Sequence, residues 1–342
     1  MLMSENKTKI AIVGFGNVGR GVYEAIKRNP DMELVGIASQ DLNRCRQVLG
    51  QDTKIHLTMN YHPFSYFTMP ERADVAILCG GSKKDLPEQG PFYAQMYNTV
   101  DSFDTHDKIP EYFAQMNVAA IKSKKVALIS GGWDPGTFSI ERVLADSFIP
   151  GSNPQATYGL TENGGLSMGH SDAIRTIDGV QDARQYTHAS PHSVQLMQEG
   201  KAQGLSAGDR MWRKCFVVLK TDTEEERERV GKEIKEMPGY FAPYRTMVHF
   251  VSQEELKEKY SQMRHDGLVV AAGETGKGNK ALIEYKNQWE SNPEATGNIL
   301  VACARAVNRF SNEGKKGAFT MLDIPPSYFS PRSKEELLKK FM

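Results

Sequence analysis

Three glycines near the start of the chain have a spacing that suits a phosphate-rich ligand. Gly14, Gly16 and Gly19 follow an apolar run and precede a helical pattern in KIAIVGFGNVGRGVYEAI, residues 9–26. This is the context of the G-x-G-x-x-G dinucleotide fingerprint. The first glycine permits a tight turn, the second lets a pyrophosphate approach the backbone, and the third lets helix and strand pack closely. The helix start then presents free N–H groups and a partial positive charge to the phosphates. A glycine-rich turn without a ligand is the alternative, which this context disfavours.

The residues after the second apolar strand should set the type of dinucleotide. An acidic residue about 20 residues beyond the glycines binds the ribose 2′-hydroxyl of NAD, whereas an arginine accommodates the 2′-phosphate of NADP. The segment ASQDLNRCR, residues 38–46, offers Asp41 for NAD, and Ser39, Arg44 and Arg46 for a phosphate. Asp41 could instead cap the helix that follows. From these residues alone, NAD and NADP both stay open.

Two polar stretches place carboxylates where open α/β sheets bind their ligands. After one apolar run come Asp101, Asp104 and His106, and after another come Trp133 and Asp134. The carboxyl ends of parallel strands meet at one edge of a sheet, where such folds bind ligands. Carboxylates beside a nicotinamide suit an amino substrate, because they hold an ammonium and accept protons as the amine becomes an imine. Turn or cap chemistry is the alternative for each aspartate, and Asp134-Pro135-Gly136 fits a turn well.

The histidines do not predict a metal site. A metal would need His106 together with the H-x-x-x-H pair His188 and His192. That pair lies in YTHASPH, which we expect to be a loop rather than a helix, and no third ligand is fixed by spacing. We therefore expect no metal.

Strand and helix patterns alternate through the first part of the chain. We expect strands at residues 9–14, 32–38, 73–79 and 125–130, a further short strand that ends at Val100, and helices at residues 21–28 and 114–122. The first strand is a near-continuous apolar run, which is typical of a strand covered on both faces. Strand, helix and strand at these spacings predict an α/β fold with a Rossmann-type doubly wound parallel sheet.

The pattern changes beyond residue 150, where Gly, Ser, Asn, His and Met become frequent. We predict a second, α+β domain at residues 151–292. Residues 213–219 and 246–251 are expected to be strands of an antiparallel sheet, with an amphipathic helix at residues 223–237 between them. Residues 293–310 form a helical pattern with one apolar face. We expect this helix to return to the first domain, which would then comprise residues 1–150 and 293–342.

The composition restricts the class of protein. Lys plus Arg number 42 and Asp plus Glu number 42 in 342 residues, so no broad positive field is available for nucleic acid or a membrane surface. The four cysteines are scattered without disulfide spacing, which is typical of a reducing compartment. The N-terminus lacks the apolar core of a signal peptide, and no run approaches the roughly 20 apolar residues of a membrane span. We expect a cytoplasmic protein that binds neither nucleic acid nor membrane.

Six segments, in order over nearly the whole chain, resemble the meso-diaminopimelate D-dehydrogenase family. They are GFGNVGRGV, LCGGSKKDLPEQ, VDSFDTHDKIP, GGWDPGTFSI, GLSMGHSDAI and GAFTMLDIPP. The stretches WDPGTFSI and LSMGHSDA are far more specific than the glycine fingerprint. The resemblance implies an enzyme that oxidatively deaminates the D-centre of meso-2,6-diaminopimelate with NADP⁺. The products are L-2-amino-6-oxopimelate, which cyclises to tetrahydrodipicolinate, ammonia and NADPH, and the reverse reaction is a one-step route to the precursor of lysine.

The resemblance also implies which residues bind the cofactor. Those at the pyrophosphate and the glycine turn are Gly14, Phe15, Gly16, Asn17, Val18 and Gly19, and those at the adenosine ribose are Ser39, Gln40 and Asp41. Those on the nicotinamide side are Gly80, Gly81, Ser82, Ser102, Phe103, Pro135 and Gly136.

The substrate residues implied by the resemblance fall into two sets. Asp104, Trp133 and Asp134 would be catalytic at the reacting carbon, and Met168 and Gly169 would contact the substrate. Thr187, Arg213, His265 and Asn292 would hold the remote L-amino-acid end. Arg213 and Thr187 would bind the distal carboxylate, and a guanidinium suits this task because it can make two parallel hydrogen bonds. Taken without the resemblance, Arg213 would be a solvated strand arginine and His265 a loop histidine.

Three positions, Gln40, Asp41 and Met168, depart from the family, and two other functions stay open. Members often carry Arg-Arg where this chain has Gln40-Asp41, so we expect NADP with NAD as a possibility, and Ser39 with Arg44 or Arg46 on the 2′-phosphate. Members often carry Gln in place of Met168. The resemblance implies a homodimer that uses the second domain for dimerisation. The alternatives are another amino-acid or semialdehyde oxidoreductase and a non-catalytic dinucleotide-sensing regulator.

Overall fold

The computed structural model describes residues 7–59 and 73–342, and the chain divides into two compact units. Unit 1 comprises Met1–Ile140 and Pro293–Met342, and unit 2 comprises Glu141–Asn292. The division falls near the start of helix α5 (Phe138–Phe148), whereas the boundary predicted at residue 150 follows its end.

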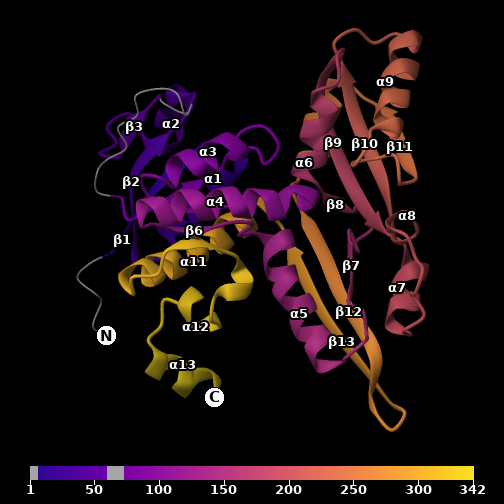
Figure 1. The fold of residues 1–342 in the computed structure, drawn as a ribbon. Coiled ribbons are helices and arrows are strands. Elements are labelled where there is room, and N and C mark those ends of the chain that lie inside the picture. The colour runs from indigo at the N-terminus through magenta and orange to yellow at the C-terminus, as the bar shows by residue number, and fades with distance from the viewer. Residues whose placement is uncertain (1–6, 60–72) are drawn as a thin grey trace. The chain divides into compact units, whose positions relative to one another are not determined.

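Unit 1 is built on a seven-stranded sheet in which all neighbouring strands are parallel. The strand order is β14-β6-β5-β4-β1-β2-β3. Figure 1 labels β1, β2, β3 and β6 of this sheet. The strands are β1 (Thr8–Val13), β2 (Met32–Ala38), β3 (His56–Thr58), β4 (Val75–Leu78), β5 (Asn98–Asp101), β6 (Val126–Leu128) and β14 (Gly317–Phe319). The chain winds outward from β1 in one direction and from β4 in the other. This is the doubly wound sheet that the sequence predicts.

Helices cover both faces of this sheet because the strands are apolar on both. Ile10 and Ile12 of β1 pack in one core cluster with α1 (Asn17–Lys27) and α11 (Asn292–Asn312). Ala11 and Val13 pack in the other cluster with α3 (Leu86–Tyr93) and α4 (Ile109–Ser123). Successive strand residues point to opposite faces, so the continuous apolar run of β1 serves both clusters. The remaining helices and helical turns of unit 1 are α2 (Leu42–Leu49), η1 (His106–Lys108), η2 (Trp133–Thr137), η3 (Met321–Asp323), α12 (Pro326–Phe329) and α13 (Lys334–Phe341).

The ends of several elements differ from the predicted ones. Helix α1 begins at Asn17 rather than at residue 21, directly after the glycine turn. The strand predicted to end at Val100 ends one residue later, at Asp101, whose carboxylate accepts a hydrogen bond from the N–H of Phe103 (3.0 Å) and turns the chain. The helix predicted at residues 293–310 is α11, and it belongs to unit 1.

Unit 2 contains two smaller sheets, with the orders β11-β10-β9-β8 and β13-β12-β7. Their strands are β7 (Gln155–Tyr158), β8 (Gly165–Leu166), β9 (Val180–Ala189), β10 (Met211–Leu219), β11 (Thr246–Phe250), β12 (His265–Gly276) and β13 (Asn279–Trp289). The helices are α6 (Met168–Arg175), α7 (Pro191–Gln198), α8 (Ala207–Arg210), α9 (Glu224–Glu236) and α10 (Gln253–Lys259). None of the helices in the described ranges is long and apolar enough to span a membrane.

The prediction that the strands at residues 213–219 and 246–251 belong to an antiparallel sheet was wrong for this pair. β10 and β11 pair in parallel, with Arg213 opposite Thr246. The helix α9 between them carries the chain back to the end at which β10 started, and a parallel pair requires such a crossover. The antiparallel partner of β10 is β9.

β12 and β13 form a long hairpin, orange in Figure 1, that was not predicted from the sequence. Lys277 and Gly278 form its two-residue loop with φ values of 52° and 76°. Two consecutive positive φ angles are those of a type I′ turn, whose twist matches that of the paired strands.

Candidate active site

The glycine turn between β1 and α1 can receive a pyrophosphate. The N–H of Gly14 (φ 92°) donates to the carbonyl of Ala38 at 2.8 Å, and a Cβ on Gly19 would lie 2.0 Å from the carbonyl oxygen of Gly14. A Cβ on Gly16 would meet nothing within 4 Å, so the backbone there is open. No side chain of the described residues caps α1. The N–H groups of its first turn are therefore available to an anion.

The other predicted residues of this turn contribute mainly their backbone. The Phe15 ring is buried and meets Tyr23 edge to face at 6.1 Å between centroids. Val18 is half-buried, and Asn17 accepts a hydrogen bond from Arg20 Nη2 at 2.6 Å. A ligand at this turn would therefore meet main-chain atoms at position 15 rather than an aromatic ring.

The segment after β2 holds a capping aspartate and an arginine, Arg44, whose charge acts on Arg20 of α1. Asp41 caps α2 by accepting from the N–H of Arg44 at 2.9 Å, which is the capping role weighed in the sequence analysis. The N–H of Asp41 donates to the buried Ser39 hydroxyl at 3.1 Å, and Gln40 is exposed. Burial and the nearby charge of Arg44 lower the pKa of Arg20. The charges of Arg20 and Arg44 are therefore near each other, and Arg44 follows the end of β2, where a ribose phosphate would lie in a Rossmann fold.

The loops after β4 and β5 are joined through Ser82. Its hydroxyl accepts from the N–H groups of Asp104 (2.9 Å) and Thr105 (3.1 Å) and lies 3.0 Å from the Thr105 hydroxyl. The N–H of Gly81 donates to Asp85 Oδ2 at 2.7 Å. The structure therefore brings the predicted Gly80–Ser82 and Asp104 segments together at the carboxyl edge of the sheet.

Asp101 is buried where the loops after β5 and β6 meet. Its Oδ1 accepts from the N–H groups of Phe103 (3.0 Å) and Ser130 (3.1 Å), and its Oδ2 accepts from the Tyr112 hydroxyl (2.8 Å). Burial raises the pKa of Asp101 to about 6 against the effect of these hydrogen bonds. The Phe103 ring stacks on Tyr112 at 4.1 Å and lies in the core, so only its backbone can line a site.

The GGWDPG segment forms an irregular helical turn beside the β5 loop. The N–H of Gly131 donates to the carbonyl of Asp101 at 2.7 Å, and a Cβ on Gly132 would lie 3.8 Å from Ser102 Cβ. Trp133 is buried against Phe138 with ring centroids 4.8 Å apart. The following Asp134-Pro135 bond is cis, and Gly136 has φ 138°. Unit 1 therefore gathers Ser82, Ser102, Asp104, Trp133 and Asp134 on neighbouring loops.

In unit 2, Arg213 is a buried cation rather than a solvated one. Its side chain on β10 donates through Nη1 to the hydroxyl of Thr187, the residue opposite it on β9, and its guanidinium carbon lies 4.0 Å from the Tyr244 ring centroid. Within the described residues, no carboxylate contributes to the electrostatic surroundings of Arg213, which come from burial, Tyr244 and Cys215, and its Nε has no hydrogen-bond partner. An unpaired buried guanidinium is the donor set that a carboxylate requires.

The other predicted residues of unit 2 lie around the starts of α6 and β12. His265 begins β12, and a Cβ on Gly165 would lie 2.4 Å from its Nδ1. Gly165 is itself paired with Thr187. Asn292 Nδ2 donates to the carbonyl of Leu166 at 3.2 Å. Met168 and Gly169, the first residues of α6, follow directly, so all six predicted substrate residues of this unit belong to connected segments.

His265 and a neighbouring histidine that the sequence analysis missed are uncharged at neutral pH. Burial lowers the pKa of His265 to about 4, with a contribution from the charge of Arg213. Burial and the charges of Arg213 and His265 lower the pKa of His170 to about 3. Arg213 is therefore the charged member of this group, which favours an anionic ligand.

Tyr244 and His170 were missed because their place depends on tertiary contacts. His170 lies in the quoted GLSMGHSDAI segment, so its position in a specific motif was the available signal.

Residues 165–169, GLSMG, also match the G-x-S-x-G pattern by letter. However, Ser167 has φ −96° and ψ 116° and caps α6, which is helix capping rather than the strained geometry of a nucleophile elbow.

The histidines considered for a metal lie elsewhere in regular structure. His188 lies in β9 and stacks on Trp212 at 4.0 Å, and His192 lies in α7, so the expected loop was wrong. His188 and Trp212 are opposite each other on β9 and β10, which explains the strand. In residues 7–59 and 73–342, no group of three or more His, Cys, Asp or Glu side chains could hold a metal ion.

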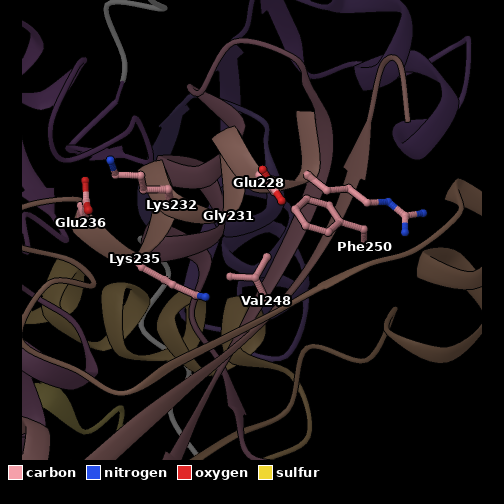
Figure 2. Close-up of a pocket in the computed structure, with 8 residues that line it drawn as sticks. Glu228, Gly231, Lys232, Lys235, Glu236, Val248 and Phe250 are labelled. Atoms are coloured by element: carbon pink, nitrogen blue, oxygen red, sulfur yellow. The ribbon is translucent and has the colours of Figure 1, made fainter. Parts of the chain in front are cut away.

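A groove of about 390 Å³ on unit 2 contains none of the predicted residues. Figure 2 shows it between α9 and β11, lined by Arg227, Glu228, Gly231, Lys232, Lys235, Glu236, Val248 and Phe250. Its charges are of both signs, and Arg227 is paired with Asp222 at 2.6 Å. The groove therefore offers no distinct charge to a substrate.

Known proteins resemble the chain over nearly its whole length. The family model of the diaminopimelic acid dehydrogenase C-terminal domain matches residues 132–291. Meso-diaminopimelate D-dehydrogenase of Ureibacillus thermosphaericus is 46% identical over 337 residues, which are 98% of this chain and 100% of that protein.

Solved structures agree with this. The Corynebacterium glutamicum diaminopimelate dehydrogenase in complex with diaminopimelate has a TM-score of 0.86 and 37% identity, and the match covers 98% of this chain and 100% of that one. An engineered D-amino acid dehydrogenase bound to NADP⁺ has a TM-score of 0.85 and 35% identity, with the same coverage. The chain therefore belongs to the meso-diaminopimelate D-dehydrogenase family.

Proposed function

We propose that this chain catalyses the reversible, NADP-dependent oxidative deamination of the D-centre of meso-2,6-diaminopimelate in lysine biosynthesis. Family membership supports this reaction. NADP⁺, when bound, supplies the acceptor of the hydride that leaves the D-configured α-carbon. Water hydrolyses the imine of the substrate, which yields L-2-amino-6-oxopimelate and ammonia.

The observation that carries this proposal is the unpaired, buried guanidinium of Arg213 beside the Thr187 hydroxyl. A buried cation is costly unless it is paired. A substrate carboxylate that accepts from Arg213 and Thr187 would offset this cost. We therefore assign Arg213 and Thr187 to the distal carboxylate, and His265, Asn292, Met168 and Gly169 to the rest of the remote end.

We assign the carboxylates of unit 1 to the D-end of the substrate. Asp104 is exposed, and its N–H is held by the Ser82 hydroxyl at 2.9 Å. Asp104 and Asp134 would hold the substrate ammonium and take up protons as the amine becomes an imine. The indole of Trp133, fixed against Phe138, would provide an apolar wall that orients the reacting carbon.

The cofactor assignment rests on the open start of α1 and on the charge near β2. Gly14, Gly16, Asn17, Val18 and Gly19, with the backbone of Phe15, would hold the pyrophosphate. Ser39 and Arg44, with Arg20, would face the 2′-phosphate, and Gln40 and Asp41 the ribose. Gly80, Gly81, Ser82, Ser102, Phe103, Pro135 and Gly136 would lie on the nicotinamide side.

We also propose a homodimer, as the family resemblance implies, with the second domain used for dimerisation. Light scattering on the purified chain checks this, and a particle of one chain would contradict it.

The decisive experiment is a dehydrogenase assay with meso-diaminopimelate and either NADP⁺ or NAD⁺, followed by the absorbance of the reduced nicotinamide. We expect turnover with NADP⁺ and a lower kcat/KM with NAD⁺. Turnover only with another amino acid or a semialdehyde would support the first alternative function. Cofactor binding without turnover of any of these substrates would support the dinucleotide-sensing alternative.

A further inference from the structure

The hydroxyl of Thr187 receives two hydrogen bonds from its own protein. Arg213 Nη1 donates to it from β10, and Gln185 Nε2 donates to it at 3.3 Å from the same strand. Guanidinium and amide nitrogens can only donate, and a hydroxyl oxygen has two lone pairs and one hydrogen. Both acceptor sites of Thr187 are therefore occupied. The hydrogen of this hydroxyl is left to point at a third group, which must be an acceptor.

Gln185 is held in place by its main chain. It lies two residues before Thr187, so both side chains project from the same face of β9. Its N–H donates to the Ser171 hydroxyl at 2.9 Å, and its carbonyl accepts from the N–H of Ser167 at 3.0 Å. These bonds tie it to α6, the helix that begins with Met168. The Gln185 amide is therefore aimed at Thr187 by a rigid backbone.

The surroundings of Gln185 make its amide unfavourable for the stability of the fold. The residue is fully buried opposite Cys215, whose pKa is raised to about 12 by burial, so the thiol is neutral. Among the described residues, Gln185 Oε1 has no hydrogen-bond partner. A buried unsatisfied polar atom destabilises the folded state, whereas an apolar side chain of similar shape would not. Such a cost is typical of residues retained for function.

We propose that Gln185 is a positioning residue that makes Thr187 a hydrogen-bond donor to the remote carboxylate of the substrate. This rests on the proposed function, in which Arg213 and Thr187 bind that carboxylate. A carboxylate only accepts hydrogen bonds, so it fits a site whose hydroxyl has been turned into a donor. A donor group at this position, such as the N–H₂ of a carboxamide or an ammonium, would face only other donors, Arg213 and the Thr187 O–H, and could not form hydrogen bonds with them. Gln185 thereby contributes to selectivity for a substrate with a second carboxylate.

The test compares two substitutions at Gln185 with a matched control on the same strand. Gln185→Glu replaces the donating nitrogen by an acceptor that would take the Thr187 hydrogen and compete for Arg213. We expect the KM for meso-diaminopimelate to rise about tenfold or more, with the KM for NADP⁺ within about twofold of the parent value. Gln181→Glu makes the same change at an exposed position of β9 and should leave both KM values unchanged.

Gln185→Met tests whether the Gln185 side chain positions Thr187 or only contributes to packing. It keeps the size of the side chain and removes the amide, so we expect an unchanged or higher melting temperature together with a KM for meso-diaminopimelate raised about threefold or more. A structural role predicts the opposite: a lower melting temperature, with substrate and cofactor affected alike. If Gln185→Glu does not fold, Gln185→Met alone decides.

The outcome also distinguishes this inference from the proposed function. If the parent chain does not turn over meso-diaminopimelate with NADP⁺, the proposed function fails, and this inference fails with it. If the parent is active but both Gln185 variants, being folded, keep the parent KM for meso-diaminopimelate, only the present inference is overturned. A parallel rise in both KM values would likewise overturn it.

Discussion

Arg213 shows how one residue can be costly for the fold and suited to a ligand. Burial lowers its pKa, while the Tyr244 ring and the Thr187 hydroxyl surround its cation. An arginine remains charged in such a place, because its intrinsic pKa is above 12. The charge is therefore present at every assay pH, and no carboxylate of the described residues is paired with it.

We predict that Arg213→Ala raises the KM for meso-diaminopimelate far more than the KM for NADP⁺. Loss of one partner of a buried charge pair costs about 2–5 kcal/mol, which corresponds to roughly 30-fold or more in affinity. Steady-state kinetics with each substrate varied in turn measures this. Arg213→Lys should recover the activity in part, because a point charge cannot make two parallel bonds.

Lys214→Ala is the matched control, since the next residue of β10 points to the other face of the sheet. It should leave both KM values near those of the parent. Equal effects of Arg213→Ala on substrate and cofactor would argue against the assignment to the distal carboxylate.

At the scale of elements, the ends of β5 and β6 decide where the catalytic candidates lie. Asp101, the last residue of β5, accepts hydrogen bonds from the loops after both strands, and its own carbonyl accepts from Gly131. Ser102–Asp104 and Trp133–Asp134 follow these anchored positions directly. The carboxylate of Asp101, which the sequence suggested for the ligand, therefore fixes two candidate loops relative to each other.

We predict that Asp101→Ala lowers both the free energy of unfolding and kcat. It leaves the buried N–H groups of Phe103 and Ser130 without an acceptor, which costs about 1–3 kcal/mol each. Urea unfolding and turnover measurements test this. Asp101→Asn keeps one oxygen acceptor and should lower the free energy of unfolding and kcat less than Asp101→Ala. Tyr112→Phe removes only the bond to Oδ2 and should lower them least. Equal losses for all three variants would contradict the anchoring role.

At the scale of the molecule, the C-terminal segment completes unit 1. Arg305 on α11 is buried and donates to Asp31 through Nε (2.6 Å) and Nη2 (2.9 Å), to Asn29 (2.8 Å) and to the carbonyl of Phe329 (2.7 Å). Asn29 and Asp31 precede β2, whereas Phe329 lies near the end of the chain. One guanidinium therefore joins the N-terminal and C-terminal parts of this unit.

We predict that this ion pair makes stability depend on acid pH. Burial would raise the pKa of Asp31, but the hydrogen bonds and charge of Arg305 outweigh it and hold that pKa below its ordinary value. The pair therefore stabilises the fold above the ordinary aspartate pKa, near 4, and the stabilisation is lost as the pH falls through the folded value. We expect Asp31→Asn to cost about 1–3 kcal/mol at neutral pH.

Chemical denaturation of the parent and of Asp31→Asn over a pH series measures this difference. The difference in the free energy of unfolding between the parent and Asp31→Asn should become smaller as the pH falls below about 4. A gap that is constant over the series would show that the charge of Asp31 does not contribute.

Local patterns predicted the parts of this protein that local chemistry controls. The glycine turn, the apolar β1 and the helix at residues 223–237 could all be read from nearby residues, because turn geometry, strand alternation and helix capping act over a few positions. Family membership, predicted from six short segments, is confirmed at 46% identity. The cytoplasmic location, the homodimer and the roles of single residues stay predictions.

Pairing between distant segments was decided only by the tertiary structure. The parallel direction of β10 and β11, the strand around His188 and the burial of Arg213 all depend on which strands become neighbours. The same holds for Gln185. Its amide donates to the Thr187 hydroxyl, which also accepts from Arg213 on the neighbouring strand β10. Nothing in the residues next to Gln185 indicates this, because a hydrogen-bond partner is set by distance in space and not by distance along the chain.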